Sequence, residues 1–321
     1  MQDSLSIHRY TLRSVAYLNA RSVRRDHEGA LIRVGAENFG YGCIHPWSEL
    51  GDVHLDETLR LLAAGQLTEL SRRALTCAHD DSEARRAGVH LFDGLTVPRS
   101  HATLMMDDAC FQSAVDAGFD RVKVKVGRDL KEESEFIHRQ ASQFPNLRWR
   151  LDFNGCLDLL SVQKFLAALG GDVRGRIDFI EDAYLHNTAP EVDAMGPYDI
   201  AMAVDRDIES ACGDFGVAII KPAVNVVDPI LKQAAECGRR VVLTSYMDHP
   251  VGQCFAAWEA AKAQKDHPGL VDACGLVTHG LFAPNAFSDA LGVPTPEFHP
   301  PAGTGLGFDD LLKSLPWKRL N

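Results

Sequence analysis

The sequence predicts an α/β protein in which a small α+β domain precedes a parallel β/α barrel. The chain has 321 residues, which suits one barrel plus a smaller domain. Its pattern changes near Pro98, from strands followed by helices to short apolar runs that alternate with amphipathic segments. We expect residues 1–97, joined by the C-terminal segment 297–321, to form the first domain and residues 98–296 to form the barrel.

The N-terminal part has the pattern of an α+β domain. We predict strands over residues 7–17, 30–34 and 40–44, with a polar, basic loop at residues 19–29. Residues 56–67 carry leucines at helical spacing and predict a helix. Three strands followed by helices favour an α+β arrangement.

After Pro98, predicted strands and helices alternate. Helices are expected over residues 107–118, 132–144, 157–169, 228–237 and 252–264. Strands are expected over residues 121–126, 147–153, 177–180, 200–204, 217–220, 240–245 and 274–278. This alternation indicates a parallel sheet, and about eight strands favour a closed barrel. No GxGxxG motif follows the first strand, which argues against a dinucleotide-binding sheet.

Composition narrows the class of partner. The net charge of −11 argues against nucleic acid and anionic membrane surfaces. Eight cysteines without a CxxC pair and without a secretory signal predict reduced thiols in a cytoplasmic protein. No stretch approaches the roughly 18 apolar residues of a membrane helix. We expect a small-molecule carboxylate substrate and a monomer or homo-oligomer.

Charged residues stand where five successive barrel strands end. In chain order they are Lys123, Lys125, Asp152, Glu181, Asp205 and Lys221. The carboxyl ends of parallel barrel strands meet at one mouth, so we expect these side chains to gather there.

The three carboxylates would be partly desolvated and would repel one another, so they need protons or a shared cation. Oxygen donors without His or Cys suit Mg²⁺ better than zinc, and Mn²⁺ is a second candidate. Lysine near a bound cation and away from bulk water has a lowered pKa and can act as a base. Lys125 and Lys221 come from different sides of the barrel and would flank a substrate carboxylate held on the metal.

Each feature has a simpler explanation. Alternating lysines are typical of an exposed strand, an Asp at a strand end commonly caps the next helix, and Lys221 could be an ordinary surface residue. The ordered series over five consecutive strands favours the functional interpretation.

That ordered series resembles the muconate-lactonising subgroup of the enolase superfamily. Within the subgroup the chain looks most like the o-succinylbenzoate synthase family. The segments that carry this likeness are residues 40–47, 122–127, 150–154 and 220–222, and Thr244-Ser245 followed by Gly252.

The resemblance implies a modified TIM barrel, (β/α)7β, with an N-terminal α+β capping domain. It implies Lys125 as the base and Lys221 as a charged group that stabilises the enediolate. It implies that Asp152, Glu181 and Asp205 hold Mg²⁺. Substrate-binding residues are then expected to be Lys123, Asn154, Thr244 and Ser245. The implied reaction is a lyase reaction of menaquinone biosynthesis, the syn-elimination of water from 2-succinyl-6-hydroxy-2,4-cyclohexadiene-1-carboxylate.

Some positions depart from the family pattern. Ala183 replaces the usual proline after Asp182, and Arg206-Asp207 replaces the usual Glu-Ser after Asp205. The same scaffold carries racemases and epimerases, so an N-succinylamino acid racemase or a dipeptide epimerase stays an alternative. A Schiff-base aldolase with Lys221 as nucleophile and a non-catalytic binding module are more distant alternatives.

Overall fold

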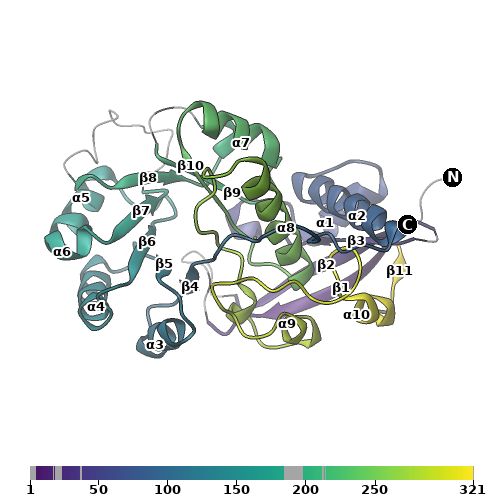
Figure 1. The fold of residues 1–321 in the computed structure, drawn as a ribbon, viewed down its shortest axis with the longest axis horizontal. Coiled ribbons are helices and arrows are strands. Elements are labelled where there is room, and N and C mark those ends of the chain that lie inside the picture. The colour runs from purple at the N-terminus through teal and green to yellow at the C-terminus, as the bar shows by residue number, and fades with distance from the viewer. Residues whose placement is uncertain are drawn as a thin grey trace.

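The computed structural model describes residues 5–16, 18, 24–36, 38–183, 198–211, 213 and 215–320. Figure 1 shows two parts side by side, one built on β1–β3 with α1 and α2, the other on the strands β4–β10 with helices around them. The last strand, β11, pairs with the first, so the C-terminal segment joins the N-terminal part.

The N-terminal sheet is antiparallel, with the strand order β11-β1-β2-β3. Its strands are β1 (Leu5–Arg13), β2 (Asp26–Val34), β3 (Gly40–Ile44) and β11 (Lys318–Arg319). Helices α1 (Leu55–Ala63) and α2 (Glu69–Ala87) follow. A Cβ on Gly42 would overlap the carbonyl oxygen of Ala74, so glycine on β3 lets α2 lie directly against the sheet.

The second sheet is parallel, and its strands follow one another in chain order. They are β4 (Ala102–Leu104), β5 (Arg121–Lys125), β6 (Arg148–Asp152), β7 (Ile177–Glu181), β8 (Ala201–Val204), β9 (Val217–Ile220) and β10 (Arg240–Leu243). Parallel bridges join Cys274 to Ser100 beside β4, and Gly275 to Thr244 beyond β10. The segment around these two residues therefore links both edges of the sheet and closes the barrel, as the sequence predicted.

Helices alternate with the barrel strands. They are α3 (Asp108–Asp116), α4 (Leu130–Gln143), α5 (Leu159–Ala168), α6 (Gly170–Arg174), α7 (Val227–Glu236) and α8 (Pro250–Asp266), followed by α9 (Ala286–Leu291) and α10 (Asp309–Ser314). The side chains of Asp107, Asp129 and Asp158 accept backbone N–H bonds at the starts of α3, α4 and α5. Between β8 and β9, the described residues include a short 3-10 helix (Ile208–Ser210).

Several sequence predictions need correction. The segment expected as a strand at residues 274–278 forms isolated bridges at Cys274 and Gly275, and helix α2 was not predicted. Strand β2 begins at Asp26, because its whole length pairs with β1, so the preceding loop is shorter than expected. Strand β4 was not predicted, because three residues are too few to form a recognisable apolar pattern. The seven described cysteines are all free.

Candidate active site

The charged side chains at the mouth of the barrel continue the inward-facing positions of the barrel strands. Buried apolar side chains form a small cluster that includes Phe179, Ala203, Ile219 and Val242. Residues two positions apart on a strand face the same side. The next residues toward the carboxyl ends on that side are Glu181, Asp205, Lys221 and Thr244. An apolar layer thus underlies a polar one, and Asp205, Lys221 and Thr244 of the polar layer line a cavity of about 580 Å³.

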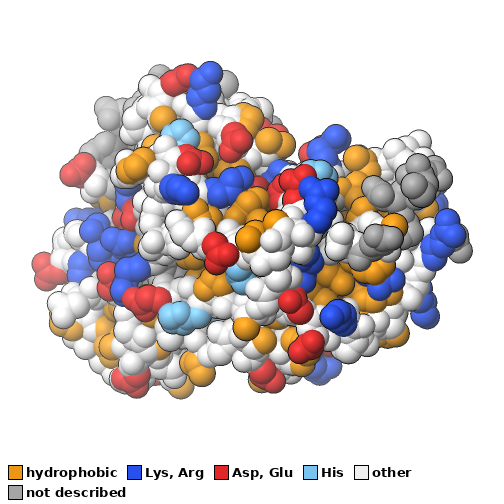
Figure 2. All heavy atoms as spheres, turned by 45° about the vertical axis from the view of Figure 1, so that its right-hand side comes forward, with side chains coloured by type: hydrophobic (Ala, Val, Ile, Leu, Met, Phe, Trp, Pro, Cys, Tyr) orange, Lys and Arg blue, Asp and Glu red, His pale blue; other side chains and the backbone are white. Residues whose placement is uncertain are grey.

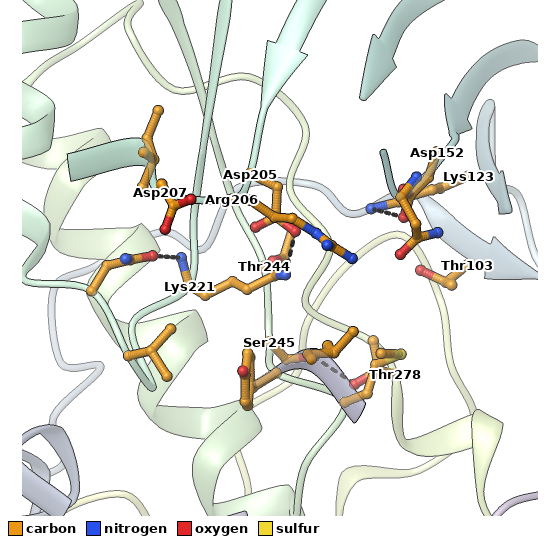
Figure 3. Close-up of a pocket in the computed structure, with 18 of the residues that line it drawn as sticks. Thr103, Lys123, Asp152, Asp205, Arg206, Asp207, Lys221, Thr244, Ser245 and Thr278 are labelled. Carbon is orange, nitrogen blue, oxygen red and sulfur yellow. Dashed lines mark hydrogen bonds and ion pairs between the residues drawn. The ribbon is translucent and has the colours of Figure 1, made fainter. Parts of the chain in front are cut away.

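Lys123 lies between two of the predicted metal ligands. Its Nζ is 3.1 Å from Oδ2 of Asp152 and 2.5 Å from Oε1 of Glu181. The Cα atoms of Lys125, Asp152 and Glu181 lie in one row across β5, β6 and β7. The third carboxylate, Asp205, forms an ion pair with Nζ of Lys221. Figure 3 shows the two pairs on opposite sides of the pocket.

Burial sets the electrostatics of these acids. Glu181 is 1% exposed, and burial together with the nearby carboxylates of Asp152 and Asp205 raises its pKa to about 8, although Lys123 opposes this. Burial acts on Asp152 in the same direction, but Lys123 and Lys125 outweigh it and lower the pKa of Asp152. The acids therefore differ in how strongly the site stabilises their charge.

The two predicted catalytic lysines have unlike environments. Nζ of Lys125 donates to the backbone carbonyl of Leu18 at 2.9 Å, and no described carboxylate lies within ion-pair distance of it. Burial lowers the pKa of Lys125. For Lys221, burial is outweighed by Asp205 and Glu181, which raise its pKa. Lys125 therefore gives up its proton more readily than Lys221.

The acids fit a divalent ion in donor type, and they lie at three neighbouring strand ends. Among the described residues, no three His, Cys, Asp or Glu side chains converge into a metal-binding group, and the carboxylates pair with Lys123 and Lys221 instead. Oε2 of Glu181 is nevertheless buried without a hydrogen-bond partner. Oxygen donors at three neighbouring strand ends, one with an orphaned buried atom, suit a hard cation such as Mg²⁺.

The predicted substrate-binding residues all line or border this pocket. Asn154 donates its backbone N–H to Asp152 at 3.0 Å, in a left-handed conformation with φ of 51°. The hydroxyls of Ser245 and Thr278 are 2.6 Å apart and partner each other. The hydroxyl of Thr244 is buried and has no partner among the described residues.

The side chains of Arg206 and Asp207, the two residues after Asp205 that depart from the family pattern, point in different directions. Nε of Arg206 lies 3.7 Å from Oδ2 of Asp182, and its side chain reaches toward the middle of the pocket (Figure 3). Asp207 is exposed, has a φ of 53° and lies on the far side of Asp205 from Asp152 (Figure 3). Asp207 is therefore poorly placed to act as a further metal ligand with Asp152.

The N-terminal domain supplies part of the pocket wall. Trp47 donates its indole N–H to the carbonyl of Tyr246 at 2.7 Å, and the Tyr246 hydroxyl donates to Asp52 at 3.0 Å. Leu50, Asp52 and Glu69 line the cavity. In the basic loop, Arg24 pairs with Glu49, and Arg21 lies outside the described residues.

Comparison with known proteins identifies the family. Residues 5–84 match the family model described as the N-terminal domain of O-succinylbenzoate synthase. The o-succinylbenzoate synthase of Bdellovibrio bacteriovorus is 32% identical over 321 residues, which covers 97% of each chain. The chain belongs to the o-succinylbenzoate synthase family.

Solved structures of other enzymes share the fold of this family member. The dipeptide epimerase from Enterococcus faecalis V583, complexed with Mg and L-Leu-L-Tyr, has a TM-score of 0.78 and 16% identity, covering 96% of this chain and 99% of that one. Muconate lactonizing enzyme from Pseudomonas fluorescens, complexed with muconolactone, has a TM-score of 0.75 and 17% identity, covering 95% and 96%. At such identities the likeness concerns the fold alone, and it confirms the predicted barrel with an N-terminal α+β domain.

The family relation agrees with the predicted lyase function, and the epimerases among the structural neighbours fit the racemase alternative only weakly. Figure 2 shows acidic and basic side chains interspersed over the described part of one face. None of the described helices combines the length and apolar character that crossing a bilayer requires.

Proposed function

We propose that this chain is a magnesium-dependent o-succinylbenzoate synthase of the cytoplasm. It would remove water from 2-succinyl-6-hydroxy-2,4-cyclohexadiene-1-carboxylate to give 2-succinylbenzoate, a step of menaquinone biosynthesis. The observation that carries the proposal is the 32% identity to an o-succinylbenzoate synthase over both domains. The unlike lysines of the mouth supply the chemistry that this reaction needs.

Asp152, Glu181 and Asp205 would hold the divalent ion. The orphaned Oε2 of Glu181 and the oxygen-only donor set support this assignment. When bound, the ion supplies positive charge that stabilises the two oxygens of an enediolate. Lys123 would remain beside the acids and balance their charge, since it pairs with two of them.

Lys125 would act as the base. Its lowered pKa increases the neutral fraction, and its bond to the carbonyl of Leu18 holds the amine in place. The neutral amine takes the proton from the carbon next to the ring carboxylate, and the C–H electrons pass into the enediolate.

Lys221 would stay protonated throughout the reaction. Asp205 and Glu181 raise its pKa, so it provides a fixed positive charge near the developing enediolate. In a syn-elimination the leaving hydroxyl is on the same face as the abstracted proton. The Lys125 ammonium can therefore return that proton to the hydroxyl, which departs as water while the ring becomes aromatic.

The test is a dehydration assay on the cyclohexadiene substrate that follows the absorbance of the aromatic product. We expect turnover with Mg²⁺, its loss when EDTA is added and its recovery when Mg²⁺ is returned in excess. Turnover that is unaffected by EDTA would contradict the metal assignment. A protein without turnover under any metal condition would contradict the proposed reaction.

A further inference from the structure

His101 presents a fixed hydrogen-bond donor to the floor of the pocket. Nη1 of Arg150 lies 2.7 Å from Nδ1 of His101. A guanidinium can only donate, so Nδ1 must accept and the ring proton must be on Nε2. Burial and the charge of Arg150 lower the pKa of His101, which keeps the ring neutral. Arg150 thus selects the tautomer with an Nε2–H donor.

The Nε2 edge of His101 lies against the backbone of Gly275. A Cβ on Gly275 would lie 2.9 Å from Nε2 and 2.8 Å from Cε1 of His101, so only glycine leaves room for the ring edge. Both residues line the pocket. Within the described part of the chain, no group accepts a hydrogen bond from Nε2.

Thr244 lies beside the same glycine. Its Cγ2 would be 3.0 Å from the added Cβ, so Thr244 and His101 approach Gly275 from the same side. Thr244 is 7% exposed, and its Oγ1 has no partner among the described residues. A buried hydroxyl without a partner is unfavourable, which points to a group that this hydroxyl meets when the pocket is filled.

The two groups lie across the barrel from the acids. Asp152 and Glu181 end β6 and β7, and Asp205 follows β8; these strands are neighbours in the middle of the strand order. His101 precedes β4 and Thr244 follows β10, the two edges that the segment around Gly275 joins. Figure 3 places Thr244 between the Lys221 side and the Thr103 side of the pocket.

We propose that Nε2 of His101 and Oγ1 of Thr244 form a subsite that binds an acceptor oxygen of the substrate's succinyl side chain. The inference rests on the proposed function, which assigns the ring carboxylate to the acids on the other side. The acceptor is the ketone or the terminal carboxylate of that side chain, since both offer an oxygen to neutral donors.

Steady-state kinetics of Thr244→Val tests the subsite. Valine keeps the approximate shape of threonine, and Oγ1 has no described protein partner to lose, so Tm should not fall. We expect KM to rise about tenfold, the effect of one lost hydrogen bond to a charged or strongly polar group, while kcat changes by less than about twofold. Thr244→Ser keeps the hydroxyl and should restore KM.

Thr58→Val is the matched control. The buried Thr58 hydroxyl donates to the carbonyl of Val53 at 3.1 Å, away from the pocket. This variant should lower Tm and leave KM unchanged. His101→Phe removes the donor and also the partner of Arg150, so we expect a lower Tm together with an about tenfold rise in KM.

Two competitive inhibitors distinguish the oxygens. These are 2-succinylbenzoate and 2-butanoylbenzoate, which lacks the terminal carboxylate. If Thr244→Val raises Ki about tenfold for 2-succinylbenzoate alone, the subsite binds the terminal carboxylate. If Ki rises for both compounds, the subsite binds the ketone oxygen. Unchanged KM and Ki values in an active enzyme overturn the subsite alone. A wild-type protein that neither turns over the substrate nor binds 2-succinylbenzoate overturns the proposed function and the subsite together.

Discussion

The two ends of the barrel both bury networks of opposite charge, but they use different cations. At the amino-terminal end, Asp178 accepts hydrogen bonds from Arg150 at 2.8 Å and from Arg240 at 2.9 Å. Asp272 accepts from Arg240 at 2.7 Å. At the mouth, the acids meet lysines: Lys123 with Asp152 and Glu181, and Lys221 with Asp205.

This difference indicates that the arginine network at the amino-terminal end serves stability and that the lysine network at the mouth serves function. A guanidinium is always charged and offers a rigid set of donors, so the arginines hold their acids permanently. An ammonium on a flexible stem can move aside and, when buried, can lose its proton. Arg150 and Arg240 overcome burial and lower the pKa of Asp178, whereas burial raises the pKa of Glu181 to about 8. The mouth therefore keeps its acids and its base available for exchange, as expected at the functional end of a barrel.

The largest expected effect is at the mouth. Lys125→Ala should reduce kcat by about 10⁴-fold, because no other described lysine there has a lowered pKa and can replace the base. The dehydration assay measures this loss, and thermal unfolding shows whether the variant is folded. Lys131→Ala, at an exposed residue on α4, is the control and should keep full activity. Full activity in Lys125→Ala would show that another group is the base.

Removal of a cation from the network at the amino-terminal end of the barrel should mainly reduce stability. Arg150→Met leaves the buried Asp178 and the partly buried Asp272 with fewer partners and frees the carbonyl of Ala273. We expect a loss of about 3–5 kcal/mol in the free energy of unfolding, measured by urea denaturation. Arg121 also pairs with Asp272, at 3.1 Å, so a loss below about 1 kcal/mol would mean that Arg240 and Arg121 suffice for this network.

A smaller effect is expected for metal binding. Asp152→Asn removes a negative oxygen and should weaken Mg²⁺ binding by at least roughly 10–100-fold, the range for residues that only support a ligand. Calorimetric titration of EDTA-treated protein measures the affinity. Asp158→Asn, at the N-cap of α5, is the control, because Asp158 caps a helix and should leave the affinity unchanged. Equal affinities in the two variants would remove Asp152 from the ligand set.

The smallest expected effect is on the stability of the protein at acidic pH. The folded-state pKa of Asp178 lies below its unfolded value, so its contribution to stability is present above the unfolded pKa and is lost as pH falls through the folded pKa. Asp178→Asn should therefore flatten the decrease in unfolding free energy below about pH 4. Urea denaturation of both proteins between neutral and acidic pH measures the slope. Identical slopes would mean that the pKa of Asp178 is the same in the folded and unfolded states.

Much of the site could be predicted from the sequence because strand periodicity is local. Apolar runs that end in a charged residue predicted that Asp152, Glu181 and Asp205 lie on successive strands, and the parallel barrel brings them to one mouth. Their roles as metal ligands stay predictions, as do the domain bounds. The position of Lys123 between two of these acids was not predicted, since it depends on which neighbouring strands face it.

The sequence by itself determined the order of strands and helices, the family and the residue types at the mouth, because these follow from spacing along the chain. Only the tertiary structure decided which charges pair, that Lys125 has no described acidic partner while Lys221 does, and that Arg150 fixes the tautomer of His101. Pairing depends on distances between residues far apart in the chain and on the burial that packing imposes. Neither quantity is written in local sequence.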